Sequence, residues 1–360
     1  MTPLEQLIHQ RIRDEGPISV ADYMGLALGH PRYGYYMTRD PFGAAGDFTT
    51  APEVSQMFGE LIGLWLAQAW LDSGAPAPMR LVEIGPGRGT LMRDALRAMT
   101  RVPGLADAAH VHLVETSPTL RERQRKTLDG AADVTWHDAL GAVPDGPTFL
   151  VANELFDALP IRQFVHRDGG WHERLIGSDG QAIGFGLGAE AQALPDAPPA
   201  PAEGDVWEES AERAALAEEI GRRVARDGGA ALLIDYGPSR PGFGDTLQAV
   251  RGHRFAPVLE APGEADLTSH VDFAALARHA ANAGALAYGP VEQGALLEAL
   301  GLDARTEALS RANPERAAEF AAARARLAGP EEMGRLFKAL ALIQPGGSTP
   351  PGFSNPPRPE

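Results

Sequence analysis

Apolar residues near the start of the chain recur at intervals of three and four positions, which is the spacing of one face of a helix. Within residues 3–15 these positions are held by Leu4, Leu7, Ile8 and Ile12. A second helix is predicted in PISVADYMGLAL, where Ser19 stands at the N-cap position and Asp22 follows three residues later. A third helix, apolar over much of its surface, is predicted from about Pro52 to Leu71.

From residue 79 the pattern changes to short apolar runs that alternate with helical segments. The runs that predict strands of a core sheet are, in chain order, MRLVEIG, HVHLVET, DVTWH, PTFLVAN, GGAALLIDYG, ALAYGPVEQ and LFKALALIQP. Helices are predicted in RGTLMRDALRAM, in SPTLRERQRKTL, from about residue 206 to 227 and in DLTSHVDFAALARHAANAG. This alternation is typical of a Rossmann-like α/β fold, with a mostly parallel sheet and helices on both faces.

Two further segments interrupt the alternation with the signature of β-hairpins. IRQFVHRDGGWHERLIG and QAIGFGLG surround Gly169-Gly170 and Asp179-Gly180, which are turn-forming pairs. Residues 189–204, rich in Ala, Pro and Glu, are expected to form a surface loop.

These patterns divide the chain into three parts. Residues 1–75 are expected to form an N-terminal region of helices and a lid. Residues 76–345 are expected to form the α/β core, with insertions at about 161–204 and 240–270. The last residues, 346–360, are rich in proline and are expected to be disordered.

The overall charge of the chain is acidic. Its 360 residues include 48 Asp and Glu against 32 Lys and Arg, and the resulting net charge of −16 repels the phosphate backbones of nucleic acids. We therefore expect no nucleic-acid partner. Solubility explains the acidity more simply than binding of a basic protein partner does. The sequence contains no cysteine and no histidine pair at metal-ligand spacing, so neither disulfides nor a metal centre are expected.

No targeting or membrane segment is recognisable in the sequence. No run approaches the roughly 18 apolar residues that span a bilayer. The first residues lack an apolar signal core and contain Glu5, Asp14 and Glu15, whereas transit peptides are poor in acids. We expect a cytoplasmic protein without membrane insertion, and its oligomeric state stays open, with a homodimer as one alternative.

The strongest chemical motif is LVEIGPGRGTL, in which an apolar strand runs into Gly85, Gly87 and Gly89 before a helix begins. Glycines allow the backbone to approach a ligand without an intervening Cβ, and the helix N-terminus offers free N–H groups. Such a turn suits a pyrophosphate or the carboxylate of an amino-acid-like cofactor, although tight turns without a ligand also match the pattern.

Two details of this motif favour S-adenosylmethionine over a dinucleotide. The dinucleotide fingerprint G-x-G-x-x-G requires its third glycine at the position of Thr90. Glu83 lies just before the glycines, where a carboxylate repels a pyrophosphate but receives the ammonium group of S-adenosylmethionine.

Acidic residues after the second and third predicted strands are further candidates for binding this cofactor. Glu115 is placed to hydrogen-bond the ribose hydroxyls, and Asp138 is placed to reach the adenine amino group. For each residue, a solvated carboxylate at a strand end is the alternative.

The segment GDFTTAPEVSQ belongs to a long connection, and such loops are often functional. We expect it to form part of a lid over the cofactor, with Gly46 and Asp47 at the methionine moiety and Thr50 as a hydrogen-bond donor. The alternative is that Asp47 or Thr50 caps the helix that begins near Pro52.

NELFDALP follows the fourth predicted strand, at the edge of the sheet where α/β proteins bind ligands. Glu154 and Asp157 are three residues apart and share a face if the segment is helical, and Asn153 offers an amide for positioning. We predict these three residues as the catalytic group. The alternative is that Asp157 caps a helix and Glu154 is solvated.

Other candidates follow the fifth predicted strand, which ends in Asp235 and Tyr236 on the same side of the sheet. His270 is a candidate base for taking a proton from the acceptor. Ser269 or Asp272 as a helix cap accounts for the same segment more simply.

The chain resembles the MidA family of methyltransferases from about residue 4 to 345. The motifs that carry this resemblance are HPRYGYY, GDFTTAPEVSQMFGE, EIGPGRGTL, NELFDALP, IDYG, GDTLQAVR, DLTSHVDF and MGRLFKALA. The resemblance implies a class I core of seven strands with added N-terminal and inserted elements, and S-adenosyl-L-methionine as methyl donor. The mitochondrial members are complex I assembly factors, which implies symmetric dimethylation of an arginine in a core subunit of respiratory complex I. We expect a bacterial member to act on a protein substrate of this kind in the cytoplasm.

Two other functions are compatible with the sequence. One is methylation of a small molecule, which an enclosed pocket would favour. The other is an assembly chaperone that binds S-adenosylmethionine without turnover. Thr90 and Glu83 disfavour a nicotinamide-binding protein.

Overall fold

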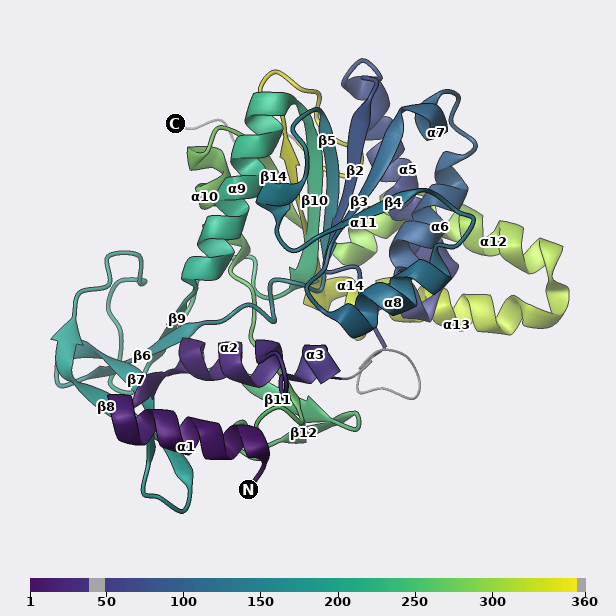
Figure 1. The fold of residues 1–360 in the computed structure, drawn as a ribbon. Helices are drawn as coiled ribbons and strands as arrows, with labels where there is room; N and C mark the ends of the chain where they lie inside the picture. The colour runs from purple at the N-terminus through teal and green to yellow at the C-terminus, as the bar shows by residue number, and fades with distance from the viewer. Residues whose placement is uncertain (39–48, 355–360) are drawn as a thin grey trace.

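The computed structural model describes residues 1–38 and 49–354, and its largest element is a seven-stranded sheet with helices on both faces (Figure 1). The strand order is β14-β15-β10-β5-β2-β3-β4. The bounds of these strands are β2 Met79–Ile84, β3 Ala109–Val114, β4 Val134–His137, β5 Thr148–Asn153, β10 Gly229–Tyr236, β14 Leu286–Glu292 and β15 Phe337–Ile343. Strands β10, β5, β2, β3 and β4 are parallel, and β15 is antiparallel to both neighbours. The predicted Rossmann-like α/β class is confirmed.

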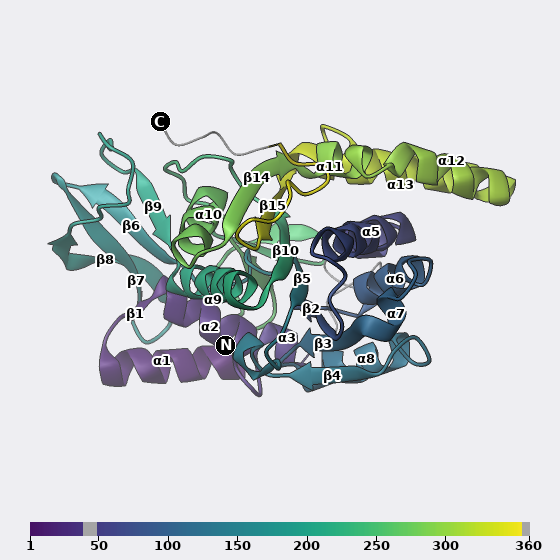
Figure 2. The ribbon, with the colours of Figure 1, turned by 90° about the horizontal axis from the view of Figure 1, so that it is seen from above.

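The apolar runs of the central strands are continuous because both faces of the sheet are buried. In β5, Phe149 and Val151 join one apolar cluster, whereas Leu150 and Ala152 join the other. The helices that contribute to the first cluster include α5 Gln56–Asp72, α6 Thr90–Met99, α11 Gln293–Ala299, α12 Leu302–Ala312 and α13 Ala317–Ala328. Those that contribute to the second are α9 Ala211–Asp227 and α10 Phe273–Asn282, and the two groups lie on opposite sides of the sheet in Figure 2.

A smaller β unit lies beside this core and is formed mainly by the inserted segments, with one short strand from the N-terminal region (Figure 1). Its five-stranded sheet contains β1 Ile18–Ser19, β6 Arg162–Arg167, β7 Gly170–Ser178, β8 Ile183–Gln192 and β9 Val206–Glu209. Its three-stranded sheet contains β11 Gln248–Arg251, β12 Arg254–Ala256 and β13 Asp266–Thr268. The shorter helices of the chain are α3 Tyr35–Thr38, α4 Ala51–Val54, α7 Leu105–Ala108, α8 Pro118–Thr127 and α14 Met333–Leu336.

The N-terminal helices α1 (Pro3–Glu15) and α2 (Val20–Gly29) pack against this β unit in one shared apolar cluster. Both helices begin with a capping box. The N-cap hydroxyl accepts from the backbone N–H of an acidic residue three positions later, and that acidic side chain accepts from the N-cap backbone N–H. The predicted N-cap at Ser19 is confirmed.

The helix predicted from about Pro52 to Leu71 is in fact two helices. α4 ends before Ser55, whose backbone is extended and whose side chain accepts a hydrogen bond from the Met57 N–H to cap α5. A serine side chain that bonds the backbone locally competes with a continuous helix, and here the cap prevails.

The helix predicted from about residue 206 begins later. Val206–Glu209 pairs with β6 as strand β9, and the Ser210 side chain then caps α9 by accepting from the Arg213 N–H. Strand pairing with a distant segment overrides local helical preference at these positions.

The first hairpin turns one residue earlier than predicted. Asp168 and Gly169, and not Gly169-Gly170, occupy the turn between β6 and β7, with φ of 51° and 78°. Positive φ at both central residues is the geometry that favours an Asp-Gly pair in a hairpin. The predicted surface loop 189–204 is also shorter, because β8 extends to Gln192.

The tail expected to be disordered packs on the core over its first part. The Trp65 indole N–H donates to the Pro351 carbonyl at 3.1 Å, and the Phe353 ring meets the Trp65 ring edge-on. The expected disorder is therefore wrong for 346–354, and residues 355–360 lie outside the described residues.

Candidate functional site

The carboxyl ends of β2, β3, β5 and β10 meet at one edge of the central sheet, facing the N-terminal helices and the inserted strands (Figure 1). The turns that follow these strands carry most of the residues predicted to bind a cofactor or an acceptor. Ligands of open α/β sheets bind at this edge.

The turn after β2 has left-handed backbone at three glycines. Gly85, Gly87 and Gly89 have φ of 67°, 51° and 79°, and Gly89 is the N-cap of α6 without a side-chain cap bond. A Cβ at Gly85 would lie 2.8 Å from Cδ1 of Leu155 in the turn after β5. Glycine therefore allows the two turns to approach each other, and Gly89 itself offers no side chain to cap α6.

Glu83 in β2 is buried directly before the glycine turn. Its Oε2 has no hydrogen-bond partner within the described part of the chain. Burial raises the pKa of Glu83 to about 8, although a hydrogen bond from the Met92 backbone acts in the opposite direction. A ligand that donates a hydrogen bond, an ammonium group for instance, would satisfy this oxygen.

We expect the stability of the ligand-free protein to fall with rising pH because of Glu83. Its pKa in the folded state is about 8, above the ordinary value of 4.5. The contribution of Glu83 to the free energy of unfolding is therefore complete below pH 4.5 and is lost as the pH rises through 8. Each pKa unit is worth about 1.4 kcal/mol. Glu83→Gln should therefore raise the melting temperature over wild type at pH 8.5 and leave it unchanged near pH 4.

Glu122→Gln is the matched control for this measurement, because Glu122 is exposed on α8. It should follow the wild-type profile at every pH. An identical pH dependence of wild type and Glu83→Gln would contradict the burial of an uncompensated carboxyl at this position.

Glu115 lies directly after β3 and is buried. Its Oε1 accepts from the Ser117 N–H at 2.8 Å and its Oε2 accepts from Gln124 Nε2 at 3.1 Å. Gln124 also donates to the Gly87 carbonyl at 2.8 Å and accepts from the Trp136 indole. Gln124 therefore joins the glycine turn, Glu115 and β4 in one network.

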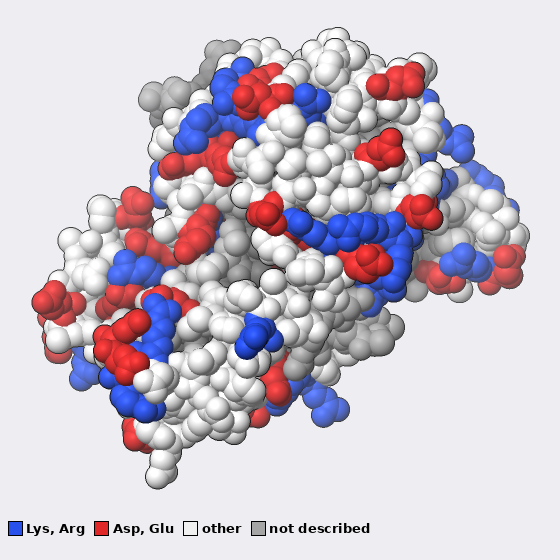
Figure 3. All heavy atoms as spheres, in the orientation of Figure 1, with Lys and Arg blue, Asp and Glu red and all other residues white. Residues whose placement is uncertain are grey.

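Among the described residues, Asp138 and Thr50 form no hydrogen bond with Gln124, Glu115 or the glycine turn. Asp138 is 87% exposed and is paired with Arg121 of α8 at 2.7 Å. Lys and Arg side chains gather over the region of α8 in the space-filling view (Figure 3). Thr50 is the N-cap residue of α4, and its side chain makes no cap bond. Gly46 and Asp47 lie outside the described residues.

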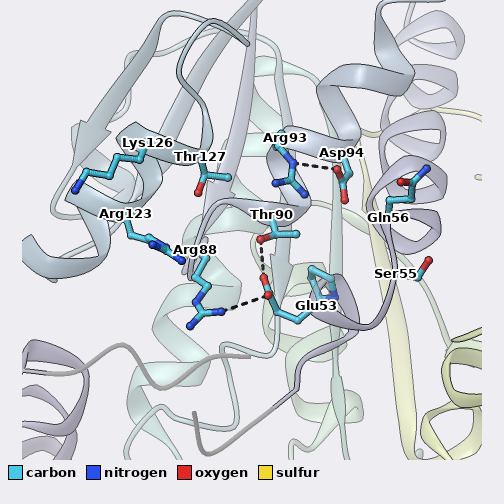
Figure 4. A pocket seen from close by; sticks show the side chains of 11 residues that line it. Glu53, Ser55, Gln56, Arg88, Thr90, Arg93, Asp94, Arg123, Lys126 and Thr127 are labelled. Atoms are coloured by element: carbon cyan, nitrogen blue, oxygen red, sulfur yellow. Dashed lines mark hydrogen bonds and ion pairs between the residues drawn. The ribbon is translucent and has the colours of Figure 1, made fainter. Parts of the chain in front are cut away.

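Helix α4 connects the glycine turn with the turn after β5. The Thr90 hydroxyl donates to Glu53 Oε1 at 2.5 Å, and Arg88 Nη1 lies 3.6 Å from Glu53 Oε2 (Figure 4). Two residues earlier, the Ala51 N–H donates to Glu154 Oε1 at 3.0 Å. Displacement of α4 would therefore disturb both turns at once.

We expect Glu53→Ala to lower kcat/KM about 10- to 100-fold, since hydrogen bonds to charged groups contribute about 1.5–3 kcal/mol. The variant should also move the acidic limb of the pH–rate profile to higher pH, because the Ala51 N–H lowers the pKa of Glu154. Other charges that act on Glu154 are Asp157, which raises its pKa, and Arg326, which lowers it.

Glu53→Gln keeps an acceptor for Thr90 and should recover part of the lost activity. Gln56→Ala is the control, because Gln56 lines the same pocket of about 520 Å³ but bonds to Glu60 (Figure 4). An unchanged pH profile in Glu53→Ala would show that α4 does not position Glu154.

The turn after β5 is organised by Asp235, the penultimate residue of β10. Asp235 Oδ2 accepts from the N–H groups of Leu155, Phe156 and Asp157 at 3.1, 2.9 and 3.1 Å. The helix considered for NELFDALP is therefore wrong, because three successive N–H groups converge on one buried carboxyl. Burial and the neighbouring Asp157 raise the pKa of Asp235 well above its ordinary value.

Asn153 and Glu154 lie side by side at the start of this turn. Asn153 Nδ2 donates to Glu154 Oε1 at 3.1 Å, and Asn153 Oδ1 is buried without a partner within the described ranges. Glu154 has a φ of +49°, which is rare for a residue other than glycine and occurs at functional turns. Burial raises the pKa of Glu154 to about 7. Glu154 is thus held by its neighbours and is not the solvated residue of the alternative interpretation.

Asp157 is the third predicted catalytic residue and is also buried. Its Oδ1 has no hydrogen-bond partner among the residues described. Burial raises the pKa of Asp157 to about 6, while the Arg213 charge and a hydrogen bond from the Tyr236 hydroxyl lower it. The structure therefore brings Asn153, Glu154 and Asp157 together, with two unpaired oxygen acceptors among them.

Arg213 supports this turn from α9 and was not predicted. Its guanidinium donates to the carbonyls of Phe156, Asp157 and His270 at 2.7, 3.2 and 2.7 Å. The sequence did contain a signal, because Arg213 falls on the buried face of an otherwise amphipathic helix. A buried arginine in that position requires acceptors from elsewhere in the fold.

His270 lies close to the turn but not within it. Its ring meets the Tyr236 ring edge-on, with centroids 5.7 Å apart. The predicted helix cap is Asp272, which accepts from the Ala275 N–H at 3.0 Å, whereas Ser269 accepts from Arg213.

Within the described ranges, no helix is long and apolar enough to cross a membrane.

The sequence and the fold both match known proteins. Residues 61–291 match the family model described as "Putative S-adenosyl-L-methionine-dependent methyltransferase". The chain is 39% identical to the protein arginine methyltransferase NDUFAF7 homolog of Drosophila melanogaster, over 94% of this chain and 84% of the relative. It is 36% identical to mitochondrial NDUFAF7 of Homo sapiens, over 95% of this chain and 84% of the relative.

Solved structures show the same architecture. A Burkholderia thailandensis protein bound to S-adenosyl-homocysteine is 30% identical and superposes with a TM-score of 0.84, covering 97% of this chain and 93% of that chain. The native crystal structure from the same organism superposes with a TM-score of 0.82 and the same coverage.

Proposed function

We propose that this chain methylates arginine side chains of a protein substrate, because it belongs to the family of S-adenosyl-L-methionine-dependent methyltransferases that includes NDUFAF7. The observation that carries this proposal is a set of three buried acceptor oxygens without partners among the described residues. They are Glu83 Oε2, Asn153 Oδ1 and Asp157 Oδ1. Buried acceptors require donors, and both the cofactor ammonium and a guanidinium are donors without acceptor atoms.

The residues around the glycine turn suit S-adenosylmethionine. Gly85 keeps the turn open where a Cβ would crowd Leu155, and Glu83 presents its unpaired oxygen. We assign the methionine moiety to the glycine turn, the ribose to Glu115 and the adenine to Asp138. Both Glu115 oxygens already accept one hydrogen bond, and a carboxylate oxygen has room for a second. When bound, S-adenosylmethionine supplies an electrophilic methyl group on its sulfonium.

The turn after β5 suits the acceptor. A guanidinium has five N–H donors, and carboxylates bind it through fork-like, charge-assisted bonds. Asp157 and Glu154 hold the positive charge on one side of the guanidinium and leave one nitrogen directed to the methyl group. Positioning of this kind supplies much of the rate in an in-line transfer.

Each methyl transfer to an arginine releases one proton, and the buried carboxyls are suited to accept it. Burial raises the pKa of Asp157 to about 6 and that of Glu154 to about 7, so both are stronger bases than ordinary carboxylates. Activity should therefore fall as the pH drops below these values.

We assign the substrate to a core subunit of respiratory complex I, modified by symmetric dimethylation in the bacterial cytoplasm. The resemblance to the MidA family supports this assignment. Mass spectrometry of complex I subunits from cells with and without this gene tests it. The proposal expects one dimethylated arginine that disappears with the gene, and unchanged methylation would remove the substrate assignment.

A further inference from the structure

A cavity of about 490 Å³ lies between the core and the inserted β unit. Residues of α9 and α10 line it from the core, and residues of β9 and of the loop before β11 line it from the inserted unit. Its volume falls within the roughly 300–1,000 Å³ of typical ligand sites. Its lining includes none of the residues assigned to the cofactor or to the acceptor arginine.

The cavity is one layer of side chains away from the acceptor turn. His270 lines it, and the His270 ring contacts the ring of Tyr236, whose hydroxyl is close enough to the Asp157 carboxyl to lower its pKa. Arg213 also lines it and donates to the Asp157 carbonyl at 3.2 Å. A peptide whose arginine reaches Asp157 would therefore have neighbouring residues close to this cavity.

Several charged groups in the lining are already engaged. Arg278 pairs with Asp196 at 3.0 Å, and Arg162 donates to Glu173 at 2.7 Å. The lining that remains for a ligand is largely aromatic and apolar. It includes Trp207, Phe243, Pro238, Pro241 and Leu276, and the first two rings contact each other edge-on.

We propose that this cavity receives an apolar or aromatic side chain that neighbours the acceptor arginine in the substrate protein. His270 completes the subsite, because it lines the cavity and a neutral imidazole offers one donor and one acceptor to a peptide backbone. The inference rests on the proposed arginine methylation and adds a preference for the sequence around the arginine.

The test uses nine-residue peptides with a central arginine. At each flanking position in turn, a peptide with phenylalanine is compared with a peptide with alanine. Dissociation constants are measured by calorimetry with S-adenosylhomocysteine present, and methyl transfer is measured with labelled S-adenosylmethionine. We expect phenylalanine at one position to tighten binding about tenfold or more, as burial of an aromatic side chain predicts. Lysine-centred peptides should keep this preference without being methylated.

Three variants locate the preference. Phe243→Ala removes an aromatic wall, and Ala214→Leu fills the cavity from α9, so both should abolish the preference for phenylalanine. Ala215→Leu is the matched control on the same helix, because Ala215 is exposed and does not line the cavity. Affinity for S-adenosylhomocysteine should be unchanged in all three.

The outcomes separate this inference from the proposed function. Methylation without a flanking preference, or a preference that survives Ala214→Leu and Phe243→Ala, overturns the subsite and leaves arginine methylation in place. A preference in binding without methylation of any arginine peptide supports the subsite and overturns the arginine function. Equal binding of N-acetylphenylalanine amide and the best peptide indicates a small-molecule site and also overturns the subsite.

Discussion

Asp157→Asn is expected to lower kcat/KM for arginine methylation about 100- to 1,000-fold, with affinity for S-adenosylmethionine within about twofold of wild type. The amide keeps the shape of the side chain but cannot neutralise a guanidinium or accept its proton. Protein stability should not fall. Asp157 and Asp235 are both buried, and the Asp157 charge raises the pKa of Asp235, so the substitution removes a repulsion between two carboxylates. Steady-state kinetics, calorimetry and thermal melting check the three parts.

Asp107→Asn is the control for this substitution, because Asp107 is exposed on α7. It should retain full activity. If Asp157→Asn kept more than about a tenth of wild-type activity, Asp157 would have no catalytic role. Loss of cofactor binding in the same variant would instead place Asp157 in the cofactor site.

Gly85→Val is expected to weaken S-adenosylmethionine binding at least about 100-fold. Gly85 has a φ of +67°, where a β-branched residue is strained by about 1–3 kcal/mol, and the added Cβ would meet Leu155 Cδ1 at 2.8 Å. Relief of that contact requires the Leu155 side chain to shift, and the strain at positive φ distorts the turn after β2. Isothermal calorimetry measures the loss of binding.

Gly130→Val separates backbone strain from the loss of the site. Gly130 has a φ of +71°, and a Cβ there would meet nothing within 4 Å. It should therefore lose stability without losing affinity for the cofactor. Equal affinities in the two variants would contradict the assignment of the glycine turn to the cofactor.

The elements of the core were predictable because their signals are local. Buried parallel strands such as β5 are continuous apolar runs, and Ser19 and Asp272 cap their helices through bonds to residues three positions away. The glycine turn was equally visible, because left-handed backbone selects glycine at fixed positions.

The parts that were missed depend on contacts between distant segments. Val206–Glu209 becomes a strand only because β6 lies beside it, and Asp235 organises a turn some 80 residues earlier in the chain. Glu154 adopts a positive φ that no local preference for glycine announces. Arg213 carries a local signal, but its carbonyl partners come from two separate loops.

The position at the end of β5 predicts Asn153, Glu154 and Asp157 as catalytic candidates, and burial in the folded structure determines their chemistry. Spacing alone suggested a shared helix face for Glu154 and Asp157, whereas the structure forms a turn held by Asp235. Burial then explains the raised pKa values of these carboxyls, which no sequence pattern contains.

The most direct measurement is a crystal structure of this protein with S-adenosylhomocysteine. We predict the amino-acid moiety at the turn of Gly85, Gly87 and Gly89, with a ligand donor on Glu83 Oε2 and the ribose hydroxyls at Glu115. A ligand bound elsewhere, or a crevice that stays closed by side chains at saturating ligand, would contradict the proposed cofactor site and the methyl transfer that depends on it.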